Sequence, residues 1–142
     1  MDMNTLNSCK MIAFVPTANI ARAKEFYKYT LGFHLVEEGP FDLMFEVSTS
    51  LLRITNVQQV FPTHYTVMGW KVPNIAAAVD KLAQKGIKFD RYEGFDQDER
   101  GVWTAPDGAK VAWFRDPDRN ILSMTQFPSA VIEELKKEAK DG

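Results

Sequence analysis

The sequence predicts an α+β fold of two βαβββ repeats, in which about eight strands form a cupped mixed sheet with helices outside, followed by a C-terminal helix. A duplicated helix start is the first observation: residues 19–23 read Asn-Ile-Ala-Arg-Ala, and residues 74–78 read Asn-Ile-Ala-Ala-Ala. A duplicated strand is the second: Leu-Leu-Arg-Ile-Thr at 51–55 matches Ile-Leu-Ser-Met-Thr at 121–125. Each repeat is too small to bury a core alone, so the two are expected to pair and to form a shared ligand-sized cup.

The composition is that of an ordinary soluble domain, with 142 residues, 45% hydrophobic and 25% charged, so 1–142 is expected to be a single domain. A net charge of −2 gives no basic footprint for nucleic acid. No apolar run approaches the roughly 20 residues that cross a membrane, and residues 1–7 do not resemble a signal peptide. Cys9 is the single cysteine, which predicts a reducing, cytoplasmic location.

The first unit is predicted to span 10–57. Its helix begins after Asn19, whose side chain can accept a hydrogen bond from a backbone N–H of the first turn, and it ends at Gly32. The apolar side of this helix consists of Ile20, Ala23, Tyr27 and Leu31. Short apolar runs predict strands at 10–15, 33–37, 43–47 and 51–57.

The second unit, 64–126, repeats this order. Asn74 caps a helix whose apolar side consists of Ile75, Ala78, Val79 and Leu82. Strands are predicted at 65–72, 88–92, 102–105, 110–115 and 121–125. A terminal helix is predicted at 128–140, packing against the body or a partner subunit.

Two motifs identify a family. Residues 23–27, Ala-Lys-Glu-Phe-Tyr, are followed by Leu-Gly-Phe at 31–33, and residues 116–120 read Asp-Pro-Asp-Arg-Asn. Over residues 10–126 this pattern resembles the vicinal oxygen chelate superfamily, which includes glyoxalase I, extradiol dioxygenases and bleomycin-resistance proteins. Arg119 stands where the family's hairpin has glycine, and a position that needs a positive φ would be strained by arginine.

The resemblance also indicates which residues occupy the metal-ligand positions of the family. In metal-dependent members, each unit supplies two ligands, one from its first strand and one from its last. The matching positions here hold Ile12, Arg53, Val67 and Ser123, which lack the imidazole, thiolate and carboxylate groups that a divalent metal needs. The chain therefore resembles the metal-free members, with no cofactor expected. His34, His64, Glu37, Glu38 and Glu46 leave an unusual metal site as an alternative.

Strand alternation predicts which side chains line the cup. The predicted ligand-binding set is Ile12, Phe14, Arg53, Val67, Gly69, Val111, Trp113 and Ser123. Phe114, between two of these, is expected to face the helices. An apolar and aromatic lining with few polar groups is typical of small-molecule sites, although the same side chains could pack against each other and fill the cup. Arg53 is either a clamp for a ligand carboxylate or phosphate, or a partner of an acidic neighbour such as Glu46, or a side chain that extends to water.

These observations favour a metal-free, homodimeric, cytoplasmic protein that binds a small organic molecule, as bleomycin-resistance proteins do by sequestration. Neither a nucleic acid nor a membrane is an expected partner, and no catalytic residue is predicted. One alternative is a lyase, isomerase or dioxygenase of the same superfamily with displaced ligands or acid–base chemistry. The other is a ligand-free interaction module with a packed cup.

Overall fold

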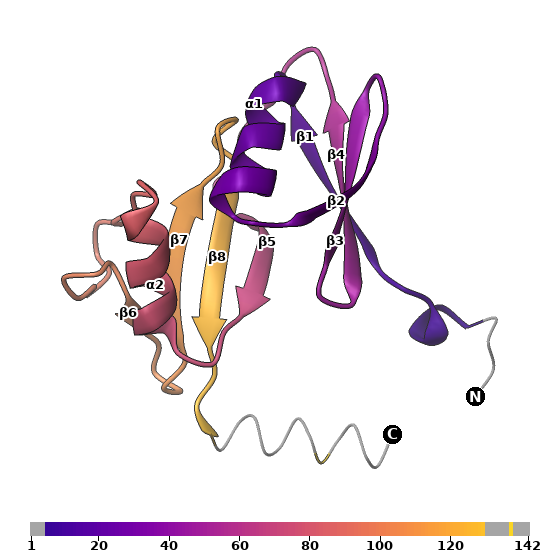
Figure 1. The fold of residues 1–142 in the computed structure, drawn as a ribbon. Coiled ribbons are helices and arrows are strands. Elements are labelled where there is room, and N and C mark those ends of the chain that lie inside the picture. Colours follow the sequence, from indigo (N-terminus) through magenta and orange to yellow (C-terminus); the bar gives the residue numbers. More distant parts are fainter. Residues whose placement is uncertain (1–4, 130–136, 138–142) are drawn as a thin grey trace. The chain divides into compact units, whose positions relative to one another are not determined.

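The computed structural model describes residues 5–129 and residue 137 (Figure 1). Within them, eight strands and two α-helices confirm the predicted α+β class, and hydrogen bonding divides the strands equally between two four-stranded sheets. The chain forms two compact units: residues 1–67 with 116–120, and residues 68–115 with 121–142. The predicted terminal helix at 128–140 lies almost entirely outside the described residues.

The sheet of the first unit has the order β1-β4-β3-β2. β1 (Ile12–Thr17) runs parallel to β4 (Ser50–Asn56), which is antiparallel to β3 (Asp42–Val47), and β3 is antiparallel to β2 (His34–Glu38). A short 3-10 turn, Leu6–Ser8, precedes β1. The strand predicted at 10–15 starts later and continues through Pro16. Because β1 is an edge strand, a residue without an N–H group is tolerated there.

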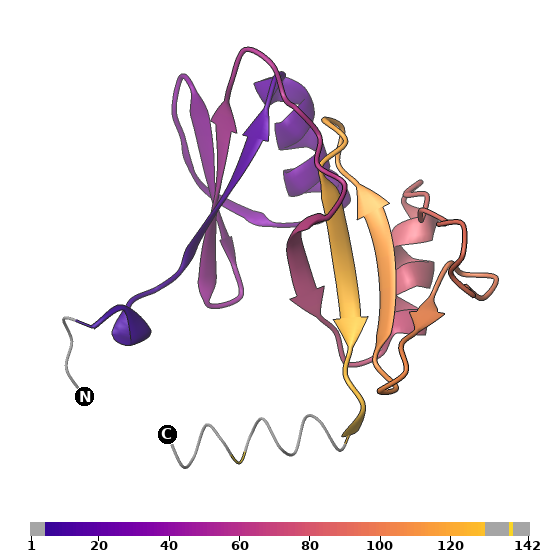
Figure 2. The same ribbon diagram turned by 180° about the vertical axis from the view of Figure 1, so that it is seen from behind.

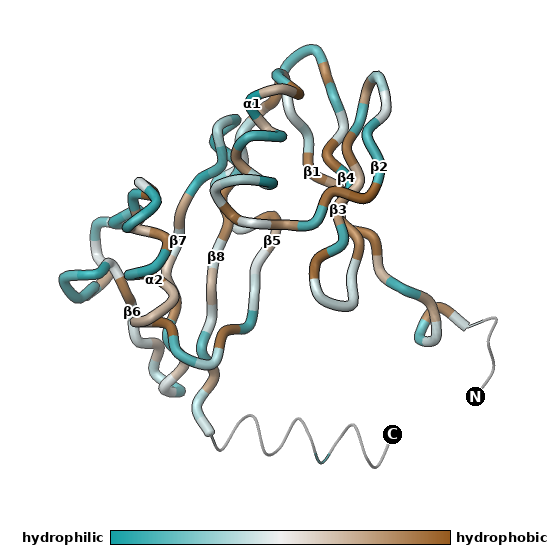
Figure 3. The backbone as a smooth tube through the Cα atoms, in the orientation of Figure 1, coloured by the Kyte–Doolittle hydropathy of each residue, from teal (hydrophilic) through white to brown (hydrophobic). Residues whose placement is uncertain are grey.

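The helix of the first unit changes its hydrogen-bond register midway. Asn19 accepts a 3.1 Å bond from the N–H of Arg22, as predicted, and opens α1 (Ile20–Lys24). The chain then continues as the π-helical turn η2 (Glu25–Thr30) and ends before Gly32, at φ +78°. Ala23 and Tyr27 are buried on the sheet side. In Figure 3 this helix carries hydrophilic segments, whereas β3 and β4 carry strongly hydrophobic ones.

A buried polar network surrounds Asp116 in the first unit. Its Oδ1 accepts bonds from the N–H groups of Asp118 and Asn120, both at 2.9 Å. Its Oδ2 accepts from the Tyr27 hydroxyl at 2.7 Å and from Asn120 Nδ2 at 2.8 Å. The turn also meets β1, because Asn120 Nδ2 donates to the Pro16 carbonyl and the Thr17 hydroxyl donates to Asp118. The turn at residues 116–120 is thus held by hydrogen bonds that a hairpin alone does not need.

Arg119 adopts φ +71°, so the strain predicted from the missing glycine is present. Replacing Arg119 with glycine is expected to stabilise the protein by about 1 kcal/mol, because glycine has no Cβ to clash in the left-handed region. Urea denaturation measures the change. Arg119→Ala is the control and is expected to be near neutral, since its Cβ keeps the strain. Equal stabilisation by alanine would show that the arginine side chain, not the backbone, is responsible.

The sheet of the second unit has the order β5-β8-β7-β6 (Figure 2). Its strands are β5 (Thr66–Lys71), β6 (Trp103–Thr104), β7 (Lys110–Arg115) and β8 (Ile121–Gln126), and β7 is antiparallel to both β6 and β8. Asn74 caps α2 (Ile75–Gln84) by accepting from the Ala77 N–H at 3.1 Å, as predicted. Ile75 and Val79 are the buried residues of this helix.

The strand predicted at 88–92 is wrong. Only an isolated bridge joins Phe89 to Phe114, and the strand predicted at 102–105 shortens to β6. The side chain of Gln97 explains the difference, because it satisfies the backbone that a strand partner would otherwise bind. Gln97 Nε2 donates to the carbonyls of Asp90 and Gly101 at 2.9 and 2.8 Å, and its Oε1 accepts from the Tyr92 N–H at 2.7 Å.

Candidate functional site

In the first unit, alternate residues of the sheet face away from the buried core. Val15, Leu52 and Ile54 are buried on the helix side, so their neighbours in sequence lie on what we call the first helix-free face. The strand register arranges this face in rows across the sheet. The face consists of Ile12, Phe14, Pro16, His34, Glu37, Asp42, Met44, Glu46, Leu51, Arg53 and Thr55.

Arg53 occupies the central row of this face, between Phe14 on β1 and Met44 on β3. Its Nη1 lies 3.3 Å from Oδ2 of Asp42, and both side chains are more than a third exposed. Its Nε is buried and has no hydrogen-bond partner. The guanidinium is therefore only partly satisfied, which is costly for a group that stays charged in proteins.

Arg53 pairs with an acidic neighbour, which is one of the predicted alternatives, but that neighbour is Asp42 and not Glu46, the residue named as an example. Glu46 instead accepts a 3.1 Å bond from Lys10. Because Arg53 is in register with Met44, Asp42 and Glu46 lie two residues to either side of its partner on β3. The lysine takes one carboxylate, and the other is left for Arg53.

The second unit has a corresponding helix-free face. Phe114 points to the helix side as predicted, where it is buried against Trp70 and Phe89 with ring centroids 6.3 and 5.6 Å away. Trp113, its neighbour in sequence, lies on the opposite face in register with Ser123. The second helix-free face consists of Val67, Gly69, Lys71, Trp103, Val111, Trp113, Arg115, Ile121, Ser123 and Thr125.

Gly69 fits this face because of Ser123. A Cβ at position 69 would lie 2.9 Å from Ser123 Oγ, closer than real Cβ atoms approach, and 3.2 Å from the Ser123 carbonyl oxygen, which is a tight contact. Glycine therefore lets β5 run beside this serine without displacing its hydroxyl. Ser123 itself is buried and lies across the ladder from Trp113.

Four aromatic residues, which we call the aromatic cluster, gather at the second helix-free face: Tyr92, Phe95, Trp103 and Trp113. The Phe95 ring is stacked with Trp103 at 5.1 Å and with Trp113 at 5.7 Å between centroids. Tyr92 meets Trp113 edge-on at 5.3 Å. Sequence reasoning included only Trp113, because the segment that carries Tyr92 was read as a strand. The sequence does carry a signal for the cluster, because Tyr92, Phe95 and Trp103 lie close together in the segment before Trp113.

An ion pair lies at one side of the cluster. Arg115 Nε donates to Asp90 Oδ2 at 2.8 Å, and the Tyr92 hydroxyl lies 3.3 Å from the same oxygen. The hydrogen bond to Asp90 raises the pKa of Arg115. Burial, followed by the charge of Asp90, raises the pKa of Tyr92. At neutral pH this edge therefore presents a charged guanidinium and a protonated phenol.

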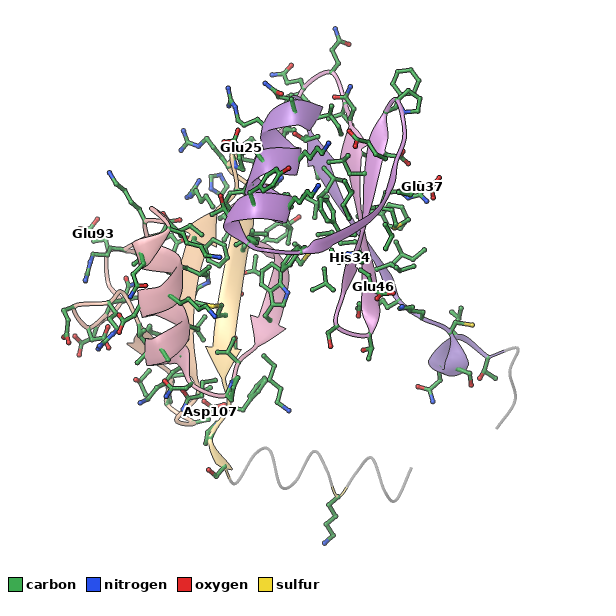
Figure 4. All side chains as sticks on the ribbon, in the orientation of Figure 1. Glu25, His34, Glu37, Glu46, Glu93 and Asp107 are labelled. Carbon is green, nitrogen blue, oxygen red and sulfur yellow. The ribbon has the colours of Figure 1, made fainter. Side chains whose placement is uncertain are left out.

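The residues of the alternative metal site are dispersed. His34 is in register with Glu46, but Glu37 is in register with Met44 (Figure 4). Glu38 pairs with Lys24 at 2.9 Å. His64 lies before β5, outside any strand. Among the described residues, no three His, Cys, Asp or Glu side chains are grouped in a way that could hold a metal ion. In the same part of the chain, no helix has the length and apolar character to cross a membrane.

Two βαβββ units, each with a helix on one face of its sheet and a helix-free face opposite, define a class of duplicated α+β proteins. The family model of the Glyoxalase/Bleomycin resistance protein/Dioxygenase superfamily matches residues 6–124. The chain therefore belongs to this superfamily. No curated protein matches it.

Solved structures show the same fold. A glyoxalase family protein from Bacillus anthracis has a TM-score of 0.66 at 16% identity, covering 84% of this chain and 95% of that one. A lactoylglutathione lyase from Agrobacterium tumefaciens has a TM-score of 0.65 at 16% identity, covering 86% and 96%. A glyoxalase family protein from Enterococcus faecalis has a TM-score of 0.60 at 20% identity, covering 82% and 94%. Likeness at these identities establishes the fold alone.

Proposed function

We propose that this protein binds a small organic molecule on a helix-free sheet face and does so without a divalent metal at the family's usual positions. The observation that carries the proposal is Arg53 on the first helix-free face, whose side chain is 39% exposed and whose ion pair with Asp42 engages Nη1. A guanidinium has further N–H donors, so those that Asp42 leaves unbound are suited to bind a carboxylate or phosphate oxygen. Phe14, in register with Arg53 and 65% exposed, supplies apolar surface beside it.

The same arginine disfavours a metal. A guanidinium cannot lose its charge in a protein, so it repels a divalent cation placed beside it. Ile12 and Val67 offer no donor atom, and the Ser123 hydroxyl is a weak ligand by comparison with imidazole, thiolate or carboxylate. These four residues therefore favour direct recognition of the ligand by the protein.

Purified protein is expected to hold far less than one equivalent of nickel, zinc or iron after mild dialysis. Elemental analysis measures this directly, and the unfolding temperature is expected to be unchanged by a chelator or by added Zn²⁺. About one equivalent of metal that a chelator removes, with loss of stability, would overturn the proposal. That result would instead favour a metal-dependent lyase or dioxygenase of the superfamily.

The exposure of Phe14 also supports a ligand site over a face filled by its own side chains. A packed face would bury this ring, because an aromatic side chain gains more than most from leaving water. Self-association as a homodimer and a cytoplasmic location stay predictions.

A further inference from the structure

We propose that the aromatic cluster of the second unit binds a planar, conjugated ring system that carries a carboxylate, with the ring on the cluster and the carboxylate directed to Arg115. This inference rests on the proposed function, since it names the chemical class of ligand that one helix-free face would take. It adds a second recognition element to Arg53, built from residues of the second unit alone.

Three rings of the aromatic cluster have similar orientations. The ring planes of Phe95 and Trp103 differ by 19°, those of Phe95 and Trp113 by 27°, and those of Trp103 and Trp113 by 34°. Phe95 is stacked on both tryptophans, and it is the exposed ring of the three, so the stack can be extended on the side of Phe95. A flat ligand can lie parallel to this ring and continue the stack, whereas a puckered molecule cannot make the same face-to-face contact.

The aromatic cluster is partly exposed to solvent. Phe95 is 45% exposed, and Trp103 and Trp113 are half-buried, so the cluster is not a sealed core. Apolar surface that remains in water gains free energy when a ligand covers it.

A cationic side chain lies on the same sheet face as the aromatic cluster. Arg115 and Trp113 are two residues apart on β7 and therefore share a face, about 7 Å from one another along the strand. Asp90 engages Nε of Arg115, and a guanidinium has further N–H donors in its planar fork. A carboxylate on the edge of a stacked ring can bind those donors. The site thus has an apolar stacking surface and a cationic end at the spacing of a two-ring molecule.

The test uses two ligands of the same charge and similar size. 2-Naphthoate is flat and conjugated, and decalin-2-carboxylate is its saturated, puckered counterpart. Isothermal titration calorimetry is expected to give at least roughly threefold tighter binding of 2-naphthoate, the lower range for losing an aromatic contact. Quenching of tryptophan fluorescence provides a second readout, because Trp103 and Trp113 belong to the cluster whereas Trp70 packs on the helix side.

Variants locate the site. Phe95→Leu is expected to weaken 2-naphthoate binding roughly three- to tenfold and to leave binding of the decalin acid unchanged. Arg115→Gln is expected to weaken both acids roughly tenfold or more, with partial recovery in Arg115→Lys. Phe41→Leu is the matched control, since Phe41 is 70% exposed and belongs to the first unit. Thermal unfolding of each variant verifies that it is folded.

Equal affinity for the two acids, or an unchanged affinity in Phe95→Leu, would overturn this inference. If 2-naphthoate fails to bind while small carboxylates bind in an Arg53-dependent way, the inference is wrong and the proposed function stands. If no organic anion binds at all, or if a stoichiometric metal is found, the proposed function is wrong as well.

Discussion

Asp116→Asn is expected to lower the free energy of unfolding by about 2–3 kcal/mol. The carboxylate of Asp116 accepts four hydrogen bonds in a buried site, two from backbone N–H groups and two from Tyr27 and Asn120. An amide presents N–H groups where one carboxylate oxygen stood, so the amide of Asn120 would face another donor. Asn120 cannot rotate to adapt without losing its bond to the Pro16 carbonyl.

Urea denaturation measures this effect, and two variants serve as controls. Tyr27→Phe removes one of the four donors and leaves the others, so a smaller loss of about 1 kcal/mol is expected. Asp107→Asn is the matched control, because Asp107 is exposed and accepts a single backbone bond from Ala109, which an amide oxygen can also accept. A loss in Asp107→Asn as large as in Asp116→Asn would contradict the role given to the buried network.

The pH dependence of the same pair of proteins provides a further check. Burial raises the pKa of Asp116, and the hydrogen bonds from Tyr27 and Asn120 offset this only in part. A carboxyl whose pKa is higher in the folded state contributes stability that is complete below its unfolded pKa and is lost as the pH rises through the folded pKa. The wild type is therefore expected to gain stability relative to Asp116→Asn as the pH falls from neutral toward the ordinary value of 3.8, and the gain is small to the extent that the hydrogen bonds to the carboxylate offset its burial.

Arg53→Ala is expected to weaken the binding of small anions roughly 10- to 100-fold, the effect of losing a charge-assisted hydrogen bond. Stability should change by only roughly 0–1 kcal/mol, because the ion pair with Asp42 is partly exposed on both sides. Acetate and inorganic phosphate are the probes. Titration followed by NMR of the arginine Nε–H groups reports the buried Nε of Arg53 directly.

Two further variants sharpen the interpretation of Arg53. Arg53→Lys keeps the charge but loses the planar fork, so only partial recovery of affinity is expected. Arg100→Ala is the matched control, because Arg100 also pairs with a carboxylate, that of Asp80, at 2.9 Å, and lies outside both helix-free faces. If Arg53→Ala binds both anions like the wild type, Arg53 is merely hydrated and the first helix-free face has no anion site there.

Local signals made much of the fold predictable from the sequence. Asn19 and Asn74 accept the hydrogen bonds expected of helix caps, because a cap depends on residues only three positions away. Arg119 was recognised as strained for the same reason, since its φ is set by one turn. Strand alternation placed Phe114 and Trp113 on opposite faces correctly, because the period of a strand does not depend on its partners.

The features that could not be predicted depend on interactions between residues that are distant in the sequence. Arg53 pairs with Asp42 and not with Glu46, because Glu46 pairs with Lys10, a residue that precedes β1. Residues 88–92 do not form the predicted strand, because the Gln97 side chain makes the hydrogen bonds to their backbone that a neighbouring strand would otherwise make. The aromatic cluster was missed for the same reason, since this loop carries Tyr92 and Phe95. No periodicity in the sequence encodes these choices, because each results from competition among groups brought together by the fold.

The buried network around Asp116 also bears on the order in which the chain folds. Tyr27 and Asp116 are 89 residues apart, and Asn120 reaches Pro16 across 104 residues. Contacts of such sequence separation slow folding, because a long loop must close before they form. During synthesis the first unit can form its strands and helix early, but it cannot close this network until residue 120 has left the ribosome. The first unit therefore reaches full stability only after residues 116–120 have been made, and until then Tyr27 lacks the Asp116 carboxylate that accepts its hydrogen bond.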